Sequence, residues 1–244
     1  MGALKRQFAG LRWGAGIVTG AVTVALANAI AIAIGFVAKA LQGPVDEPIF
    51  ERIDRAGTTD WTDVLETLTQ MGNVRQTQIL GAALAILFAI WFATRGWRWW
   101  IPIVLFPAAW WIARLCQLTI AAIVDRDRDL ISLVGTKIGA FPSGGCARIV
   151  LISGTAVVLA SYYGALSKKA TQWLLGIPLV LGLAEAYFRT RLNQHWFTDV
   201  VAGVLYGWLM LAALSKTLKA FDPDPAAAGV ARSRADHDGV DAPA

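Results

Sequence analysis

Six long apolar blocks alternate with short polar segments along this chain. Each block is long enough to cross roughly 30 Å of hydrocarbon once tilt and helical ends are allowed for. Long apolar runs of this kind are typical of membrane-spanning helices. The pattern therefore predicts an all-α fold, a six-helix transmembrane bundle with spans at residues 13–41, 79–94, 99–124, 145–163, 173–188 and 199–218.

The composition agrees with this pattern and excludes one class of partner. Of the 244 residues, 56% are hydrophobic and only 16% are charged, whereas a soluble domain has roughly 25% charged residues. The net charge of +5 does not indicate nucleic-acid binding, because the basic residues are scattered over short loops and form no continuous patch. We therefore expect membrane lipids, and no nucleic acid, around this protein.

The distribution of charge in the loops predicts the topology. Lys and Arg lie before the first block, between the second and third, between the fourth and fifth, and after the sixth. Residues 43–74 instead hold seven acidic residues against two basic ones. Because short basic loops stay in the cytoplasm, we expect both termini to be cytoplasmic.

This topology divides the chain into four parts. We expect a cytoplasmic N-terminus at residues 1–12 and a six-span membrane domain at residues 13–220. Residues 43–74 would form an outer amphipathic segment, helical from Phe50 to Met71. A polar tail at residues 221–244 is predicted to be disordered and cytoplasmic. Gly203 and Gly207 form a G-x-x-x-G pattern in the sixth span, which favours close helix packing.

Three polar clusters fall on the outer face in this topology. They are the run of alternating Asp and Arg at residues 125–129, the segment 141–148 that opens the fourth span, and the segment 189–199 between the last two spans. Together they predict an anion site. The backbone N–H groups of Ser143, Gly144 and Gly145 at a helix start can hold a phosphate. Arginine side chains of the neighbouring clusters can bind its oxygens in pairs.

The third cluster also carries a nucleophile and its partner. His195 precedes Asp199 by four residues, so both side chains share one face if the helix has begun. A carboxylate in that place holds the imidazole in one tautomer and stabilises its cation. A neutral imidazole nitrogen can then attack phosphorus.

The clusters resemble the type-2 phosphatidic acid phosphatase superfamily, the membrane lipid phosphatases related to the vanadium haloperoxidases. Arg189-x5-His195-x3-Asp199 is similar to the third motif of that family, with Phe188 where Ser is usual, and Pro142-Ser143-Gly144 is similar to the second. The resemblance implies phosphate contacts by Ser143, by Arg189 and by a first-motif arginine, either Arg126 or Arg128. It also implies that His195 is the nucleophile and that Asp199 is its partner.

Two departures from the family pattern affect the chemistry. Gly145 stands where the second motif has a His that acts as general acid. The first motif of the family is Lys-x6-Arg-Pro, and its Lys is also absent. The Lys position is Ala121 if Arg128 is the motif arginine, and Thr119 if Arg126 is. We regard Lys137, Arg148 and Glu185 as auxiliary candidates that compensate for these losses.

The missing general acid bears on the substrate. An alkoxide is about as basic as hydroxide, whose conjugate acid has a pKa of about 15.7, whereas phosphate leaves more easily because its second pKa is about 6. We therefore predict an integral membrane lipid phosphatase without metal or cofactor, in a bacterial inner (plasma) membrane with its active site facing outward. It would act on a lipid phosphate or, by preference, a polyprenyl diphosphate, through a phosphohistidine.

Two alternatives stay open at this point. A phosphotransferase would pass the group to a lipid or sugar hydroxyl instead of water. A catalytically silent protein of the same fold would bind phospholipid or act as a scaffold. The sequence also leaves homo-oligomerisation open.

Overall fold

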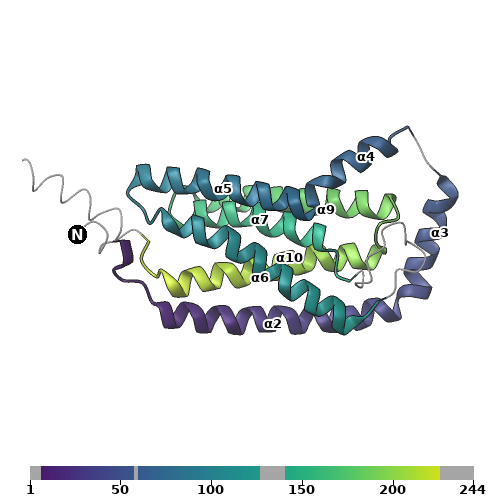
Figure 1. Ribbon diagram of the computed structural model, residues 1–244, viewed down its shortest axis with the longest axis horizontal. Helices are drawn as coiled ribbons and strands as arrows, with labels where there is room; N and C mark the ends of the chain where they lie inside the picture. Colours follow the sequence, from purple (N-terminus) through teal and green to yellow (C-terminus); the bar gives the residue numbers. More distant parts are fainter. Residues whose placement is uncertain (1–6, 58–59, 127–140, 226–244) are drawn as a thin grey trace, which may run out of the picture.

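The computed structural model describes residues 7–57, 60–126 and 141–225, and the regular structure within these residues is helical (Figure 1). Six segments are long and apolar enough to cross a membrane, which confirms the predicted all-α fold with six spans. They are α2 (Trp13–Ala40), α5 (Val74–Arg95), α6 (Trp100–Val124), α7 (Gly144–Tyr162), the pair α8 (Lys168–Leu174) and α9 (Gly176–Arg191), and α10 (Phe197–Phe221).

Helix α7 is the most buried of these spans and packs against α5, α6, α9 and α10. Its closest approach is to α10, where two glycines replace side chains. A Cβ atom at Gly203 would lie 2.5 Å from the Ser143 carbonyl oxygen, and one at Gly207 would lie 2.8 Å from the Ala147 carbonyl oxygen. The close packing predicted from the G-x-x-x-G pattern is therefore confirmed, and it fixes the start of α7 against the start of α10.

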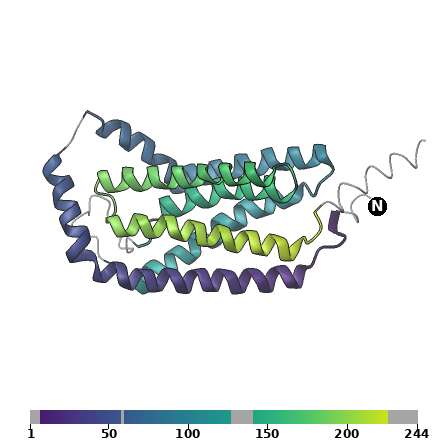
Figure 2. The ribbon, with the colours of Figure 1, turned by 180° about the vertical axis from the view of Figure 1, so that it is seen from behind.

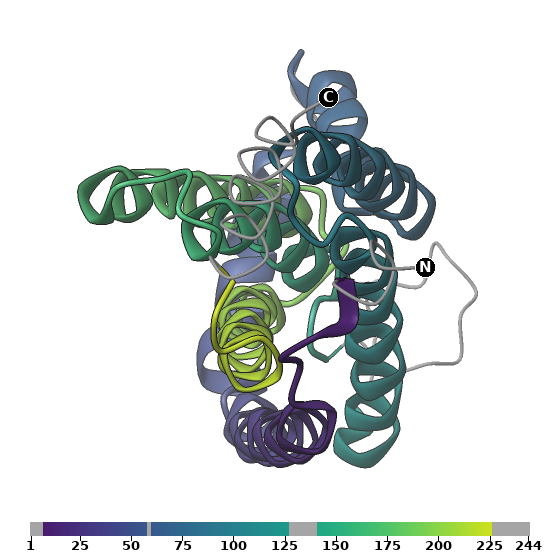
Figure 3. The same cartoon turned by 90° about the vertical axis from the view of Figure 1, so that its left-hand side faces the viewer.

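Helix α10 also runs beside α2, as views from behind and along the bundle show (Figures 2 and 3). The two helices are tied at one end, where the Arg12 N–H donates to the Phe221 carbonyl oxygen at 2.8 Å. The first and last spans therefore begin and end on the same side of the bundle. Which side of the membrane this is stays a prediction.

Beyond α10, Asp222 is 1% exposed and forms an ion pair with Arg98 at 2.6 Å. Tyr163, just past α7, donates its hydroxyl to the same carboxylate at 2.7 Å, and burial together with the Asp222 charge raises the pKa of this tyrosine. Asp222, at the start of the predicted tail, is thus held in place by a buried ion pair. The rest of the predicted disordered tail, residues 226–244, lies outside the described residues.

At the opposite end, a strap crosses the bundle from α2 to α5 (Figure 1). We define the strap as the described residues between 42 and 73. It contains a π-helix (Gln42–Asp46), α3 (Glu47–Ala56), α4 (Thr62–Thr69) and a 3-10 turn (Gln70–Gly72). The segment from Phe50 to Met71, predicted to be helical, holds more than one helix. Gly57 adopts a φ of +65° after α3, a left-handed conformation that commonly ends a helix.

Candidate functional site

Asp199 joins the three polar clusters at the strap end of the bundle. Its Oδ1 atom accepts a hydrogen bond from Arg126 Nη1 at 2.5 Å, and its backbone carbonyl accepts one from the Ser143 N–H at 3.0 Å. Its Oδ2 atom lies 3.6 Å from His195 Nδ1. Residues distant in the sequence therefore converge on one buried residue, Asp199, through its carboxylate and its backbone carbonyl.

The local fold of the third cluster explains the position of its histidine. Helix α9 ends at Arg191, and α10 begins at Phe197 with Trp196 in extended conformation as its N-cap. Asp199 thus falls in the first turn of α10, and it is fully buried. His195 is 6% exposed, so the imidazole sits at the edge of the site beside a carboxylate screened from solvent.

Arg126 is held by a second carboxylate that sequence reasoning missed. Asp46, at the end of the π-helix, forms an ion pair with Arg126 Nη2. Its other contacts are with Thr198, which donates its N–H to Oδ1 at 2.9 Å and its hydroxyl to Oδ2 at 2.6 Å. Asp46 is 1% exposed. Nothing in the local pattern distinguishes it from the other acids of residues 43–74, because its partners are more than 70 positions away.

The start of α7 differs from the predicted anion site in one donor, because the Ser143 N–H already donates to the Asp199 carbonyl oxygen at 3.0 Å. Ser143 is the N-cap in extended conformation and is fully buried, and Gly144 and Gly145 form the first turn. The first N–H groups of a helix have no acceptor within it, so the glycines offer backbone donors without side-chain obstruction.

Arg189 occupies the space that a side chain at position 145 would need. A Cβ atom on Gly145 would lie 2.5 Å from Arg189 Nε and 2.6 Å from Cζ. The guanidinium is fixed there by an ion pair with Glu185 Oε1 at 2.5 Å and by a hydrogen bond from Nη2 to Asn73 Oδ1 at 3.0 Å. The guanidinium of Arg189 therefore covers the place where the family pattern has a His.

The far end of the strap closes over this region. The carbonyl oxygen of Gly72 accepts a hydrogen bond from Arg148 Nη2 at 2.9 Å, and the Thr69 hydroxyl donates to Glu185 Oε1 at 3.3 Å. The Glu185 carboxylate lies directly against the Cα of Gly72, and a Cβ there would overlap it. The strap is thus fastened to the site at both ends, by Asp46 and by residues 69–73.

The predicted site residues therefore fall into two groups. Arg126, Ser143, His195 and Asp199 form a connected set, and Gly144, Gly145, Arg148, Glu185 and Arg189 surround the first turn of α7 next to it. Arg128 and Lys137 lie outside the described residues. Within the described ranges, no group of three His, Cys, Asp or Glu side chains converges in a way that could hold a metal ion.

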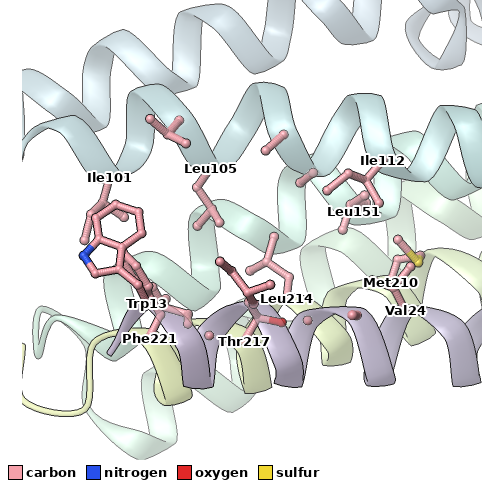
Figure 4. A pocket seen from close by; sticks show the side chains of 18 of the residues that line it. Trp13, Val24, Ile101, Leu105, Ile112, Leu151, Met210, Leu214, Thr217 and Phe221 are labelled. Carbon is pink, nitrogen blue, oxygen red and sulfur yellow. The ribbon is translucent and has the colours of Figure 1, made fainter. Parts of the chain in front are cut away.

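A cavity of about 450 Å³ lies elsewhere in the bundle, between α2, α6 and α10 (Figure 4). It is lined almost wholly by apolar side chains, among them Trp13, Ile101, Leu105 and Phe221. These residues belong to the end of the bundle where α2 begins and α10 ends, remote from Asp199. The cavity therefore provides no catalytic group.

Comparisons with known proteins bear on the family and the fold. The family model of the PAP2 superfamily matches residues 123–222, which include all three clusters. No curated protein matches the chain. The crystal structure of a transmembrane PAP2-type phosphatidylglycerolphosphate phosphatase from Bacillus subtilis superposes with a TM-score of 0.58 at 20% identity, and the match covers 79% of this chain and 92% of that one.

Proposed function

Because this chain belongs to the PAP2 superfamily, we propose that it hydrolyses a lipid phosphate or polyprenyl diphosphate through a phosphohistidine. The family match and the six-helix fold support membrane lipid phosphatase function. The finer proposal is carried by one observation, the convergence of three clusters on Asp199. Arg126 and His195 approach its buried carboxylate, and the Ser143 N–H donates to its backbone carbonyl oxygen.

The Asp199–His195 pair supports nucleophilic catalysis. With Nδ1 facing the carboxylate, Nε2 is the nitrogen that attacks phosphorus. The N–P bond forms while the bond from phosphorus to the leaving oxygen breaks, and the electron pair stays on that oxygen. The 3.6 Å separation is longer than a hydrogen bond, and such contacts often tighten when substrate binds. Water then attacks phosphorus, the N–P bond breaks, and inorganic phosphate leaves.

The start of α7 supports stabilisation of the transferred group. Its free backbone N–H groups and the guanidinium over Gly145 are fixed before substrate arrives. Donors that are already oriented toward developing charge lower the barrier without reorganisation. We propose that the N–H groups of Gly144 and Gly145, the hydroxyl of Ser143 and the guanidinium of Arg189 hold the phosphoryl oxygens there.

Arg126 acts on this site through Asp199. Its guanidinium donates to the carboxylates of Asp46 and Asp199, so it orients the partner of the histidine. The predicted direct contact between Arg126 and phosphate stays a prediction, and it requires a phosphate oxygen to join or replace one of these carboxylates.

The leaving group supports a preference for diphosphate. Gly145 supplies no general acid, and general acid catalysis is typically worth about 10²–10⁴-fold. A lipid phosphate leaves unprotonated more readily than an alkoxide.

We propose that the site faces outward, because the basic loops cluster at the opposite end of the bundle.

One observation favours the alternative of a silent lipid-binding protein. Arg126 and Arg189 both donate to protein carboxylates, which weakens their attraction for a substrate phosphate. The phosphotransferase alternative has no such structural support, and product analysis with added acceptor alcohols distinguishes it from a hydrolase.

Substitution of His195 tests the proposal. Purified protein is assayed for phosphate release from lipid phosphates and lipid diphosphates, with His195→Ala compared with the wild type. The chain has only two histidines, so His237→Ala is a matched control. We expect His195→Ala to abolish turnover and His237→Ala to retain it. A wild-type protein that binds these lipids but releases no phosphate would instead favour the silent alternative.

A further inference from the structure

Three arginines gather near the first turn of α7, and among the described residues they outnumber the carboxylates paired with them. Arg114 comes from α6, Arg148 from α7 and Arg189 from α9. Within the part of the chain that the structure describes, the ion pairs of these arginines involve a single carboxylate, that of Glu185. Arg148 is buried and forms no ion pair among the described residues. Buried charge without a counter-ion is costly, so this arginine indicates an anionic ligand.

Arg148 is the most informative member of this group. It is 6% exposed, and its Nε has no hydrogen-bond acceptor among the described residues. Its Nη1 lies 2.6 Å from the point where a Cβ on Gly144 would stand, so the guanidinium is aimed at the start of the helix. A buried charged donor without an acceptor is rare, and a ligand oxygen would satisfy it.

Arg114 reaches the same flank through Gln117. Arg114 Nη1 donates to Gln117 Oε1 at 2.7 Å. That oxygen lies 2.7 Å from the same Cβ position on Gly144, while Nε2 of Gln117 donates to the Pro142 carbonyl oxygen at 3.3 Å. Arg148 therefore lines the Gly144 side of the turn, with Arg114 behind Gln117 on the same flank, whereas Arg189 lines the Gly145 side.

We propose that Arg114 and Arg148 form a second phosphate subsite, which binds the lipid-linked phosphate of a diphosphate substrate. This inference rests on the proposed function and names the substrate class of that site. The phosphate to be transferred lies with Arg189 and His195, and its neighbour lies at the Gly144 flank.

The subsite accounts for turnover without a general acid. When His195 Nε2 bonds to the terminal phosphorus, the bond from this phosphorus to the bridging oxygen breaks. The electron pair and the new negative charge stay on the lipid phosphate, next to Arg148 and Arg114. Fixed cations that meet the charge as it develops lower the barrier, so no proton is needed on the leaving group.

The kinetic test compares two substrates in each of four proteins. A polyprenyl diphosphate and the matching monophosphate are assayed with the wild type, Arg148→Gln and Arg114→Gln. Arg75→Gln is the control, because Arg75 is an exposed arginine at the start of α5. We expect Arg148→Gln to lower the ratio of kcat/KM for diphosphate over monophosphate about 100-fold, as loss of one fixed donor does. Arg114→Gln should lower it less, and Arg75→Gln should leave it unchanged.

A binding test separates failure of the subsite from failure of the proposed function. In His195→Ala protein, which lacks the nucleophile, thermal unfolding is followed with inorganic diphosphate and with orthophosphate. We expect diphosphate to raise the unfolding temperature more than orthophosphate does, and Arg148→Gln and Arg114→Gln to remove this difference. The subsite is refuted if the variants keep the difference in unfolding temperature between the two anions. It is also refuted if they lower kcat/KM for both lipid substrates by the same factor. An inactive wild type that still shows this difference would overturn the phosphatase proposal and leave the subsite standing.

Discussion

Replacement of Asp46 by Ala tests whether the strap orders the catalytic carboxylate. Asp46 accepts hydrogen bonds from Arg126 and from the N–H and hydroxyl of Thr198. Removing one partner of a buried ion pair costs about 3–5 kcal/mol, and Arg126 keeps Asp199, so the lower end applies. A loss of about 3 kcal/mol lowers the unfolding temperature by about 6–12 °C in a chain of this size.

Activity should fall as well, because Arg126 would lose one of the two carboxylates that fix its position beside Asp199. We expect turnover of lipid diphosphate to fall at least about 10-fold, the factor that corresponds to 1.4 kcal/mol. The assay is phosphate release at a temperature where both proteins are folded. Glu51→Gln is the control, since Glu51 lies on the same strap and forms an exposed pair with Arg55. An Asp46→Ala protein that matched this control in stability and turnover would refute the reasoning.

Three further predictions concern packing and a distant ion pair. Gly145→Ala and Gly145→His place a Cβ within 2.6 Å of a guanidinium, so calorimetry should show that the free energy of unfolding falls by about 1–3 kcal/mol for either variant. Gly145→His should also not raise the turnover of phosphate monoesters. Gly72→Ala should destabilise the protein by a similar amount, because its Cβ overlaps a carboxylate, whereas Gly43→Ala, with open space around it, should leave the unfolding temperature unchanged or higher. Arg98→Gln leaves the buried carboxylate of Asp222 uncompensated and should cost about 3–5 kcal/mol, with kcat retained below the unfolding transition.

The spans were predictable because the bilayer imposes a length and an apolar composition on each helix. The meeting of the three clusters was also predictable, since alternating spans bring every second loop to the same face. His195 and Asp199 could be paired from their spacing, as could Arg189 and Glu185, because residues four apart share a helix face.

The fastening of the strap could not be predicted. Asp46 and Arg126 are 80 positions apart, and Thr69 and Glu185 are 116 apart. Such pairs depend on how whole helices pack, which the local pattern of apolar and polar residues does not encode. The partner of Arg114 was missed for another reason. Gln117 lies one turn away, but an uncharged side chain in an apolar helix gives no sign that it is an acceptor.

The exchange at position 145 links these features into one arrangement. A His there, as in the family pattern, would meet the guanidinium of Arg189. That guanidinium is fixed by Glu185 and Asn73, and Glu185 is in turn packed against Gly72 of the strap. Restoring the His would therefore require Arg189 to move and its ion pair to break. The absence of a side chain at position 145 and the position of Arg189 are thus physically coupled, so we expect that a single substitution at Gly145 does not return the site to the family chemistry.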